Sequence, residues 1–302
     1  MNSYLAVVAA SLGATAFFAL ATALKHRSAG RSPDAQQFGA REVGRFIAAT
    51  ARSPLYLAGL LADVGGLGLQ VYALHIGALA VVQPLMITAL LFSLVLNHRF
   101  AGTRITGAEL WWAAVLIASL VGFLFASGAV AAGRDAKILA DHGPATAAGV
   151  VAIAAALACL TLARRLPHGR GAALIGIAVG ITYACTAALI KSSTNIAVRG
   201  PGALLTSWQP YVLIAAGAAG LLLSQLAFQA GPLTASLPAI ATVDPLLSVA
   251  LGVFVYDERL RPGLVAGAGD AAFLVALSAA AIFLSRVKAA SESPVLQPVA
   301  GA

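Results

Sequence analysis

Nine apolar stretches of about 20 residues follow one another along this 302-residue chain, and charged loops separate most of them. Because an α-helix rises 1.5 Å per residue, each stretch is long enough to cross the roughly 30 Å hydrocarbon core of a bilayer. The stretches cover residues 3–24, 54–74, 77–97, 109–130, 144–163, 171–191, 208–229, 233–255 and 263–285. The sequence therefore predicts an all-α polytopic membrane protein with about nine transmembrane helices.

The composition excludes a water-soluble domain. Hydrophobic residues make up 60% of the chain and charged residues 10%, whereas about 25% of a typical soluble domain is charged. The net charge of +8 does not indicate a nucleic-acid partner, because the basic residues lie in short loops of the kind that orient membrane proteins. We expect the lipid bilayer as the main surrounding, no nucleic acid, and either a monomer or a homodimer.

The distribution of basic residues predicts the orientation. The loops after the first, third, fifth and seventh spans, with the C-terminal tail, hold 13 of the 19 Lys and Arg residues, and the opposite side holds 6. Cytoplasmic loops carry the excess of basic residues in multi-pass proteins. We therefore expect a plasma-membrane protein with its N-terminus outside and its C-terminus in the cytoplasm.

The spans group into two halves. Residues 1–130 form the first half, which contains a basic loop at 25–53; residues 131–285 form the second half; and residues 286–302 are expected to be a disordered cytoplasmic tail. In the loop, Val43, Phe46 and Ile47 recur at helical spacing, away from the arginines. This pattern fits either an amphipathic helix on the inner leaflet or a solvated basic linker.

An internal repeat relates the second to fourth spans to the seventh to ninth. Gly77 aligns with Gly231, and Pro84 aligns with Pro238. The two blocks have opposite predicted topology, because the second span starts inside and the seventh starts outside. Inverted repeats of this kind are typical of secondary transporters, in which two halves move around a shared site.

The second block carries a tight Gly-Pro turn, Pro238, Pro245 and then Glu258-Arg259 before the last span. In these features it resembles an EamA-type repeat of the drug/metabolite transporter (DMT) superfamily. The nine spans with a long basic loop after the first are similar to the NIPA-type magnesium transporters. The resemblance implies a bundle of two inverted repeats that moves a small solute or metabolite, or alternatively magnesium. NIPA-type chains tend to carry a glutamate and an asparagine roughly where this chain has Leu67 and Gln70.

Three acidic residues, Asp63, Asp244 and Asp270, lie inside spans. Asp244 is about 17 Å into its predicted helix, near the middle of the membrane. An ionised carboxylate at that depth is costly, so such residues usually face the protein interior or a wet cavity. Each acid is therefore either part of a substrate or ion path, or a protonated or hydrogen-bonded structural residue.

Several uncharged polar residues lie at similar depth and either line the path or join neighbouring helices by hydrogen bonds. Asp63 and Gln70 are seven residues apart and share one helix face. Because Asp63 and Asp244 belong to opposite repeats, we expect both to face one central cavity. The candidate path comprises Asp63, Gln70, Gln83, Tyr183, Gln225, Asp244 and Asp270.

Pro238 and Pro245 predict a break in the eighth span. Proline lacks an amide hydrogen and frees a backbone carbonyl one turn earlier, which suits a cation or hydroxyl-bearing solute. The alternative is a simple packing kink. Lys191 and Trp208 lie at span ends, where long basic and aromatic side chains serve as interfacial anchors. The spacing of Gly176 and Gly180 predicts close helix packing.

These features together predict a secondary-active transporter, coupled to an ion or proton gradient. A divalent-cation transporter is the alternative within the same class. A non-transporting membrane scaffold or sensor is the alternative outside it. The chain shows no Cys/His metal-ligand spacing, no Ser-His-Asp arrangement and no phosphate-binding loop. We therefore expect no enzymatic activity and no cofactor, and the sequence leaves open whether the path binds a metal.

Overall fold

The computed structural model describes residues 2–29, 54–102, 104–128, 142–231, 233–258 and 264–292. Within these ranges the chain is helical and forms no β-strand, and nine helical segments are long and apolar enough to cross a membrane. The prediction of an all-α protein with nine spans is confirmed for this part of the chain. Residues 25–29 of the predicted basic loop belong to the first helix, and the rest of that loop lies outside the described residues.

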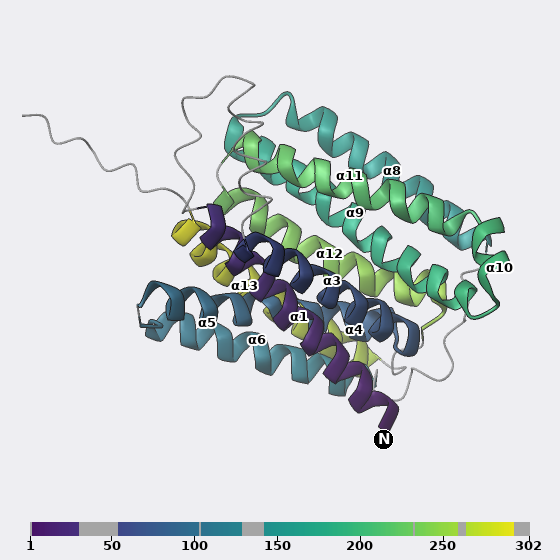
Figure 1. Ribbon diagram of the computed structural model, residues 1–302, viewed down its shortest axis with the longest axis horizontal. Helices are drawn as coiled ribbons and strands as arrows, with labels where there is room; N and C mark the ends of the chain where they lie inside the picture. Colours follow the sequence, from purple (N-terminus) through teal and green to yellow (C-terminus); the bar gives the residue numbers. More distant parts are fainter. Residues whose placement is uncertain are drawn as a thin grey trace, which may run out of the picture.

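The helices pack side by side with their long axes roughly aligned (Figure 1). In chain order they are α1 (Asn2–Ala29), α3 (Pro54–Ile76), α4 (Leu79–Met86), α5 (Ala89–Ala101), α6 (Gly107–Ala126), α8 (His142–Ala163), α9 (His168–Ala197), α10 (Pro201–Thr206), α11 (Gln209–Ala230), α12 (Leu233–Tyr256) and α13 (Leu264–Glu292). In Figure 1, α8, α9 and α11 form one edge of the bundle, and α5 and α6 form the opposite edge.

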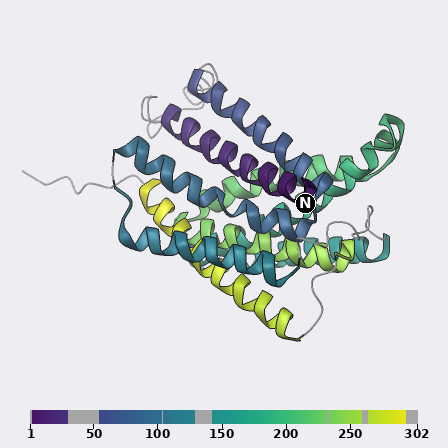
Figure 2. The same ribbon diagram turned by 90° about the horizontal axis from the view of Figure 1, so that it is seen from below.

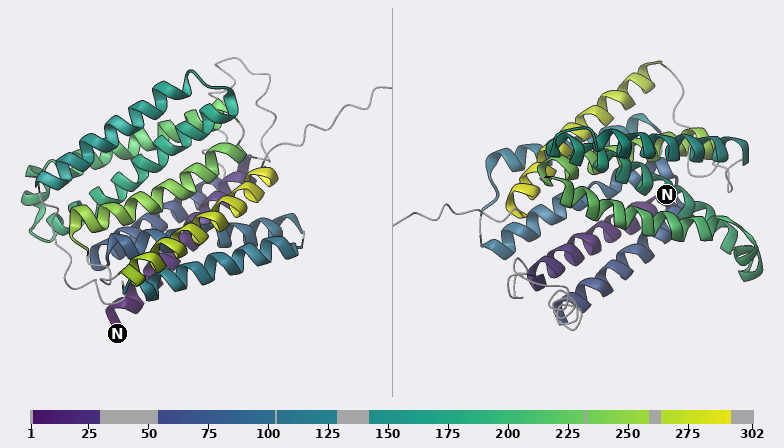
Figure 3. Two further views of the ribbon diagram at one scale, coloured as in Figure 1. Left: turned by 180° about the vertical axis from the view of Figure 1, so that it is seen from behind. Right: turned by 90° about the horizontal axis from the view of Figure 1, so that it is seen from above.

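Three sets of neighbouring helices build the bundle. α1 packs against α3 (Figure 2), while α9 packs against α8, α11 and α12. α13 lies against α6 and α12 (Figure 3). The largest set of buried apolar side chains surrounds α4 and includes Leu79, Val82, Leu116, Phe123 and Leu277. The centre of the bundle is therefore α4, which packs mainly against α12 and α1, and the same apolar cluster includes residues of α6 and α13.

The third span is broken where the sequence predicted continuity. α4 ends at Met86 and α5 begins at Ala89. Between them, the amide groups of Ile87 and Thr88 donate to carbonyls three residues earlier, Pro84 O and Leu85 O, at 3.3 and 3.1 Å. Such tight turns are common where a proline interrupts the regular helical ladder. The break lies in the first half of the chain.

The predicted break of the eighth span is wrong, because α12 continues from Leu233 to Tyr256 through both prolines. α9 packs closely against α12 along this stretch. A Cβ atom added at Gly176 would lie 2.7 Å from the Ser236 carbonyl oxygen, and one added at Gly180 would lie 3.1 Å from the Asp244 amide nitrogen. The two glycines let the α9 backbone support α12 where the prolines weaken it, and their predicted packing role is confirmed.

Local interactions determine where one helix ends and the next begins. α5 ends at Gly102, which adopts the left-handed conformation (φ 66°) that favours glycine. α6 begins with a capping box, in which Glu109 Oε2 accepts from the Thr106 amide at 2.6 Å while Thr106 Oγ1 accepts from the Glu109 amide at 3.3 Å. The other Glu109 oxygen lies 3.0 Å from His98 Nε2, joining α5 to α6.

The last helix is longer than predicted. α13 continues to Glu292, so residues 286–292 of the predicted disordered tail are helical. Alanine, arginine and lysine in this segment favour a helix that extends past the hydrocarbon core. The remainder of the predicted tail, residues 293–302, lies outside the described residues.

Candidate functional site

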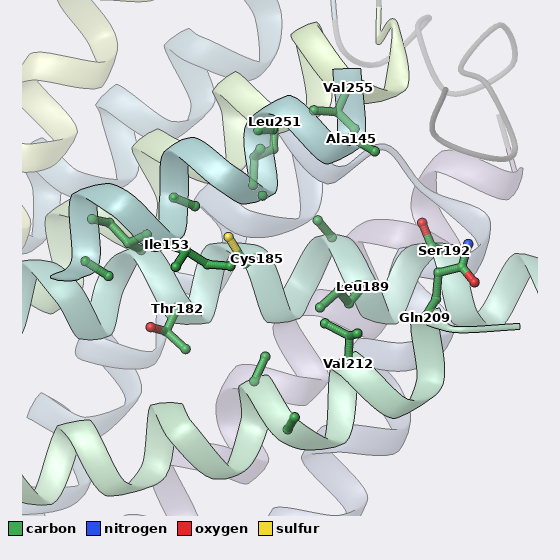
Figure 4. Close-up of a pocket in the computed structure, with 18 of the residues that line it drawn as sticks. Ala145, Ile153, Thr182, Cys185, Leu189, Ser192, Gln209, Val212, Leu251 and Val255 are labelled. Atoms are coloured by element: carbon green, nitrogen blue, oxygen red, sulfur yellow. The ribbon is translucent and has the colours of Figure 1, made fainter. Parts of the chain in front are cut away.

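A cavity of about 420 Å³ lies between α8, α9, α11 and α12 (Figure 4). α8 and α11 both pack against α9, and the cavity occupies the space that they leave between them. Ile153 of α8 lines it with 64% of its surface exposed, and Trp208, before α11, lines it with 46% exposed. The cavity therefore opens at the flank of the bundle, which faces lipid in a membrane.

The cavity reaches from one end of the bundle to about its middle. On α9 its lining runs from Ile181 to Ser192, which corresponds to about 16 Å along the helix axis. Ile181 lies near the midpoint of the span Gly169–Ala197. The N-terminal ends of α8 and α11 and the C-terminal ends of α9 and α12 meet at the other end of the cavity. The predicted topology places that end outside the cell.

None of the described residues that line the cavity carries a formal charge, and most are small and apolar. They are Ala145, Ala148, Gly149, Ala152, Ile153, Ala156, Ile181, Thr182, Cys185, Ala188, Leu189, Ser192, Trp208, Gln209, Val212, Ala215, Ala216, Ala219, Leu251, Val255 and Tyr256. Such a lining favours an apolar or amphipathic molecule, because an ion placed there would lose its hydration without gaining a charged partner.

Hydrogen-bonding groups gather at one end of the cavity, where Figure 4 shows Ser192 and Gln209. The Tyr256 hydroxyl donates to the Ala188 carbonyl oxygen and lies 2.7 Å from Ser192 Oγ. A phenol has one hydrogen, so Ser192 must donate to the Tyr256 oxygen, and Ser192 Oγ keeps its capacity to accept. Gln209 Oε1 is buried and has no hydrogen-bond partner in the described part of the chain.

Asp244 lies beside the deep end of the cavity, on the face of α12 that contacts α9. Ser248 donates to Asp244 Oδ1 at 3.3 Å from one helical turn further along. Tyr183 and the cavity residue Cys185, both on α9, are close enough to interact electrostatically with the Asp244 carboxyl group. Asp244 and Tyr183, two of the candidates from sequence, are thus brought together at the α9–α12 contact.

A buried ion pair lies behind the polar end of the cavity. Lys191 Nζ of α9 forms an ion pair with Glu258 Oε1, just past the end of α12, and their side chains are 5% and 0% exposed. Glu258 also accepts from the amides of Leu79 at 2.6 Å and Ala80 at 2.8 Å. Lys191 Nζ additionally donates to the Gly77 carbonyl oxygen at 3.1 Å. Two charges from the second half thus bind the start of α4 in the first half.

The ion pair is adjacent to the cavity through Tyr256. Lys191 Nζ lies 5.1 Å from the centre of the Tyr256 ring, within the range of a cation–π interaction. The hydroxyl of the same ring reaches Ser192 in the cavity wall. A displacement of Tyr256 would therefore disturb both the cavity and the contacts of Lys191.

The remaining sequence candidates lie elsewhere. Asp63 and Gln70 are partly buried on α3, which contributes no residue to the cavity lining. Gln225 is exposed on α11. The cavity therefore does not bring Asp63 and Asp244 together. It also does not bring Gln70 or Gln225 to the other candidates.

Two buried candidates have unsatisfied polar atoms. Gln83 on α4 is 2% exposed, and its Nε2 lacks a hydrogen-bond partner among the described residues. Asp270 on α13 is 6% exposed, and its Oδ1 likewise lacks one there. Neither residue lines the cavity between α8, α9, α11 and α12.

The interpretation of Lys191 as an interfacial anchor is wrong, because its side chain is buried against Glu258 rather than extended toward lipid headgroups. The sequence placed Lys191 at the end of its span, whereas α9 continues to Ala197. Ser192, Ser193 and Asn195, which follow it, are also buried. The polar residues that continue after Lys191 could have indicated a longer helix with a buried polar end. They could not have identified Glu258 as the partner of Lys191.

The described residues contain no group of three or more His, Cys, Asp or Glu side chains that could hold a metal ion. Mg²⁺ is commonly bound through one or two carboxylates and several retained waters. The observation therefore excludes, among the described residues, only a site built from three or more such side chains. The cavity lining itself offers no carboxylate.

Comparisons with known proteins identify one relative over most of the chain. A protein described as uncharacterized, from Corynebacterium glutamicum, is 29% identical over 262 residues, which make up 86% of this chain and 88% of the relative. No family model matches the chain. No solved structure matches it.

Proposed function

We propose that this protein is a secondary-active transporter of the DMT type, which moves a small solute or metabolite across the plasma membrane. The observation that carries the proposal is the cavity beside Asp244. It extends from one end of the bundle of described helices to about its middle, the depth at which secondary transporters hold their substrates.

The packing of the helices supports the proposal. In the first half α3 lies against α1, and in the second half α11 lies against α9. The tight turns before α4 and α12 contain the aligned residues Gly77 and Gly231. This correspondence is what two inverted repeats would produce, and Lys191 and Glu258 join the halves at one end.

Asp244 supplies a group for coupling to a proton or cation gradient. Its carboxyl group lies about halfway along α12, and it accepts a hydrogen bond from the neutral hydroxyl of Ser248. A charged carboxylate there is unfavourable, and binding of a proton or cation relieves that cost. If movement of α9 against α12 changes the surroundings of Asp244, proton binding and solute binding become linked.

Uptake into proteoliposomes tests the proposal. The purified protein is reconstituted with an imposed proton or sodium gradient, and uptake of a panel of neutral and charged metabolites is compared with uptake of Mg²⁺. We expect gradient-driven uptake of an organic solute and its loss in Asp244→Asn, which keeps the side-chain shape but removes the charge. Asp63→Asn serves as the matched control in a span that does not line the cavity.

Three outcomes decide between the candidate functions. Uptake of Mg²⁺ with no organic solute would replace the proposal by a divalent-cation transporter. The absence of uptake of every solute tested, with correctly folded protein, would favour a scaffold or sensor. Uptake that is unchanged in Asp244→Asn would leave transport in place but remove Asp244 from the coupling mechanism.

A further inference from the structure

We propose that the cavity between α8, α9, α11 and α12 binds an uncharged long-chain amphiphile with a hydrogen-bond-donating head, which enters from the flank of the bundle. This inference rests on the proposed function and specifies its substrate class. It follows from three properties of the cavity: the absence of charge among its described lining residues, the concentration of polar groups at one end, and its exposed side.

The lining determines the charge and shape of the ligand. Because no lining residue in the described part of the chain is charged, a ligand with a formal charge would leave water without a compensating partner among them. At the polar end, Lys191 and Glu258 neutralise each other behind Tyr256, and Asp244 lies beside the opposite, deep end of the cavity. The apolar wall extends about 16 Å along α9, so the apolar part of the ligand is elongated.

The polar end determines the head of the ligand. Gln209 Oε1 is a buried acceptor without a partner in the described residues, and Ser192 Oγ retains its capacity to accept. Buried acceptors of this kind are normally hydrogen-bonded in folded proteins. A hydroxyl head can donate to Ser192 Oγ, and to Gln209 Oε1 once a rotation of the Gln209 side chain turns this buried oxygen toward the cavity. Trp208 lines the same end, and tryptophan prefers the level of the lipid headgroups.

The open flank determines the route of entry. Three residues that line the cavity are also exposed on the surface of the bundle: Ile153 of α8, Trp208 just before α11, and Val212 of α11. α8 also exposes Val150 and Val151, which favours contact with lipid rather than with another helix of this chain. An amphiphile in the adjacent leaflet could therefore enter between α8 and α11 without crossing the aqueous phase.

Photolabelling of the protein in phosphatidylcholine nanodiscs tests this assignment. The probe is a dodecanol that carries a diazirine near the end of its chain, the competitor is 1-dodecanol, and the charged comparator is the corresponding photoreactive dodecyltrimethylammonium. Labelled positions are mapped by peptide mass spectrometry. We expect adducts within residues 181–192 and 208–219, competition by 1-dodecanol, and little labelling of these segments by the cationic probe.

Two variants of α11 provide a matched pair. Ala216 lines the cavity, whereas Ala218 is exposed and does not line it. Ala216→Phe should fill the cavity and remove the competed adducts, and Ala218→Phe should retain them. In Gln209→Leu the concentration of 1-dodecanol needed for half-competition should rise about threefold to tenfold, as expected for the loss of one hydrogen bond.

The outcomes separate this inference from the proposed function. Adducts that 1-dodecanol does not displace, or that persist in Ala216→Phe, would show only contact with surrounding lipid and overturn the inference. Equal labelling by the cationic probe would overturn the uncharged class. Competed adducts in a protein that transports no solute would support the binding site while refuting transport. Transport without competed adducts would support the proposed transporter while refuting this binding site.

Discussion

The ammonium group of Lys191 on α9 and the carboxylate of Glu258 after α12 neutralise each other in a place where neither side chain reaches the surface. Glu258 also accepts two amide hydrogen bonds at the start of α4, and Lys191 donates to the carbonyl of Gly77 just before it. The desolvation of both charges is therefore compensated by groups from two halves of the chain. This arrangement makes the pair a structural connection between the halves and leads to specific stability predictions.

Removing one member of the pair should destabilise the protein. In Glu258→Gln the charge of Lys191 stays buried without a counter-ion, which should lower the free energy of unfolding by about 3 kcal/mol or more. Thermal unfolding of the purified protein in detergent measures the change. Asp257→Asn is the control, because Asp257 is the adjacent residue, loses the same charge and is exposed. Equal destabilisation in the two variants would contradict the assigned role of Glu258.

Replacing both Lys191 and Glu258 should lower the free energy of unfolding by less than the sum of the two single replacements. Lys191→Met and Glu258→Gln each leave a group without its partner, whereas the double variant leaves no buried charge. We expect a coupling of about 1–3 kcal/mol between the two sites in a double-mutant cycle. The same thermal unfolding measurement applies. Additive effects would mean that Lys191 and Glu258 act on stability independently.

Gly252 should not tolerate a side chain. A Cβ atom at this position would overlap with Glu258 Oε2 and lie 3.1 Å from the Ala80 amide nitrogen. Gly252→Ala should therefore displace the carboxylate and destabilise the protein by ~1–3 kcal/mol. Gly217→Ala on α11, where a Cβ would meet no atom within 4 Å, should be neutral or slightly stabilising. Comparison of the two unfolding temperatures checks this, and a neutral Gly252→Ala would contradict it.

The predicted orientation can be tested with introduced cysteines in a background where Cys159 and Cys185 are replaced by alanine. Thr206, on the short helix α10, is exposed at the polar end of the cavity, which the charge distribution places outside. A cysteine at Thr206 should react with a membrane-impermeant reagent on intact cells, whereas cysteines at Ser32 and Ser291 should not. The reverse pattern would invert the topology and place the polar end of the cavity on the cytoplasmic side.

The nine spans could be predicted from the sequence because membrane insertion depends on a local property. A helix satisfies its own backbone hydrogen bonds, so about 20 consecutive apolar residues are sufficient to identify a span. The close packing at Gly176 and Gly180 was predictable for a similar reason, since small residues one helical turn apart form a groove on any helix. Asp244 could be proposed as a candidate because a carboxyl group at mid-membrane depth is rare in any context, and its role stays a prediction.

The tertiary structure alone decided which residues meet, because burial and pairing depend on neighbours that are distant in the chain. Lys191 becomes a buried residue only through Glu258, 67 positions away, and Glu258 reaches the amide of Leu79 across 179 positions. α12 continues through Pro238 and Pro245 where α9 packs closely against it, and no local pattern of α12 reveals this neighbour. The cavity likewise exists because α8 and α11 pack against α9 and leave space between their small residues. Apolar side chains gain little free energy from choosing one helix over lipid, so the pattern that specifies each span does not specify its neighbours.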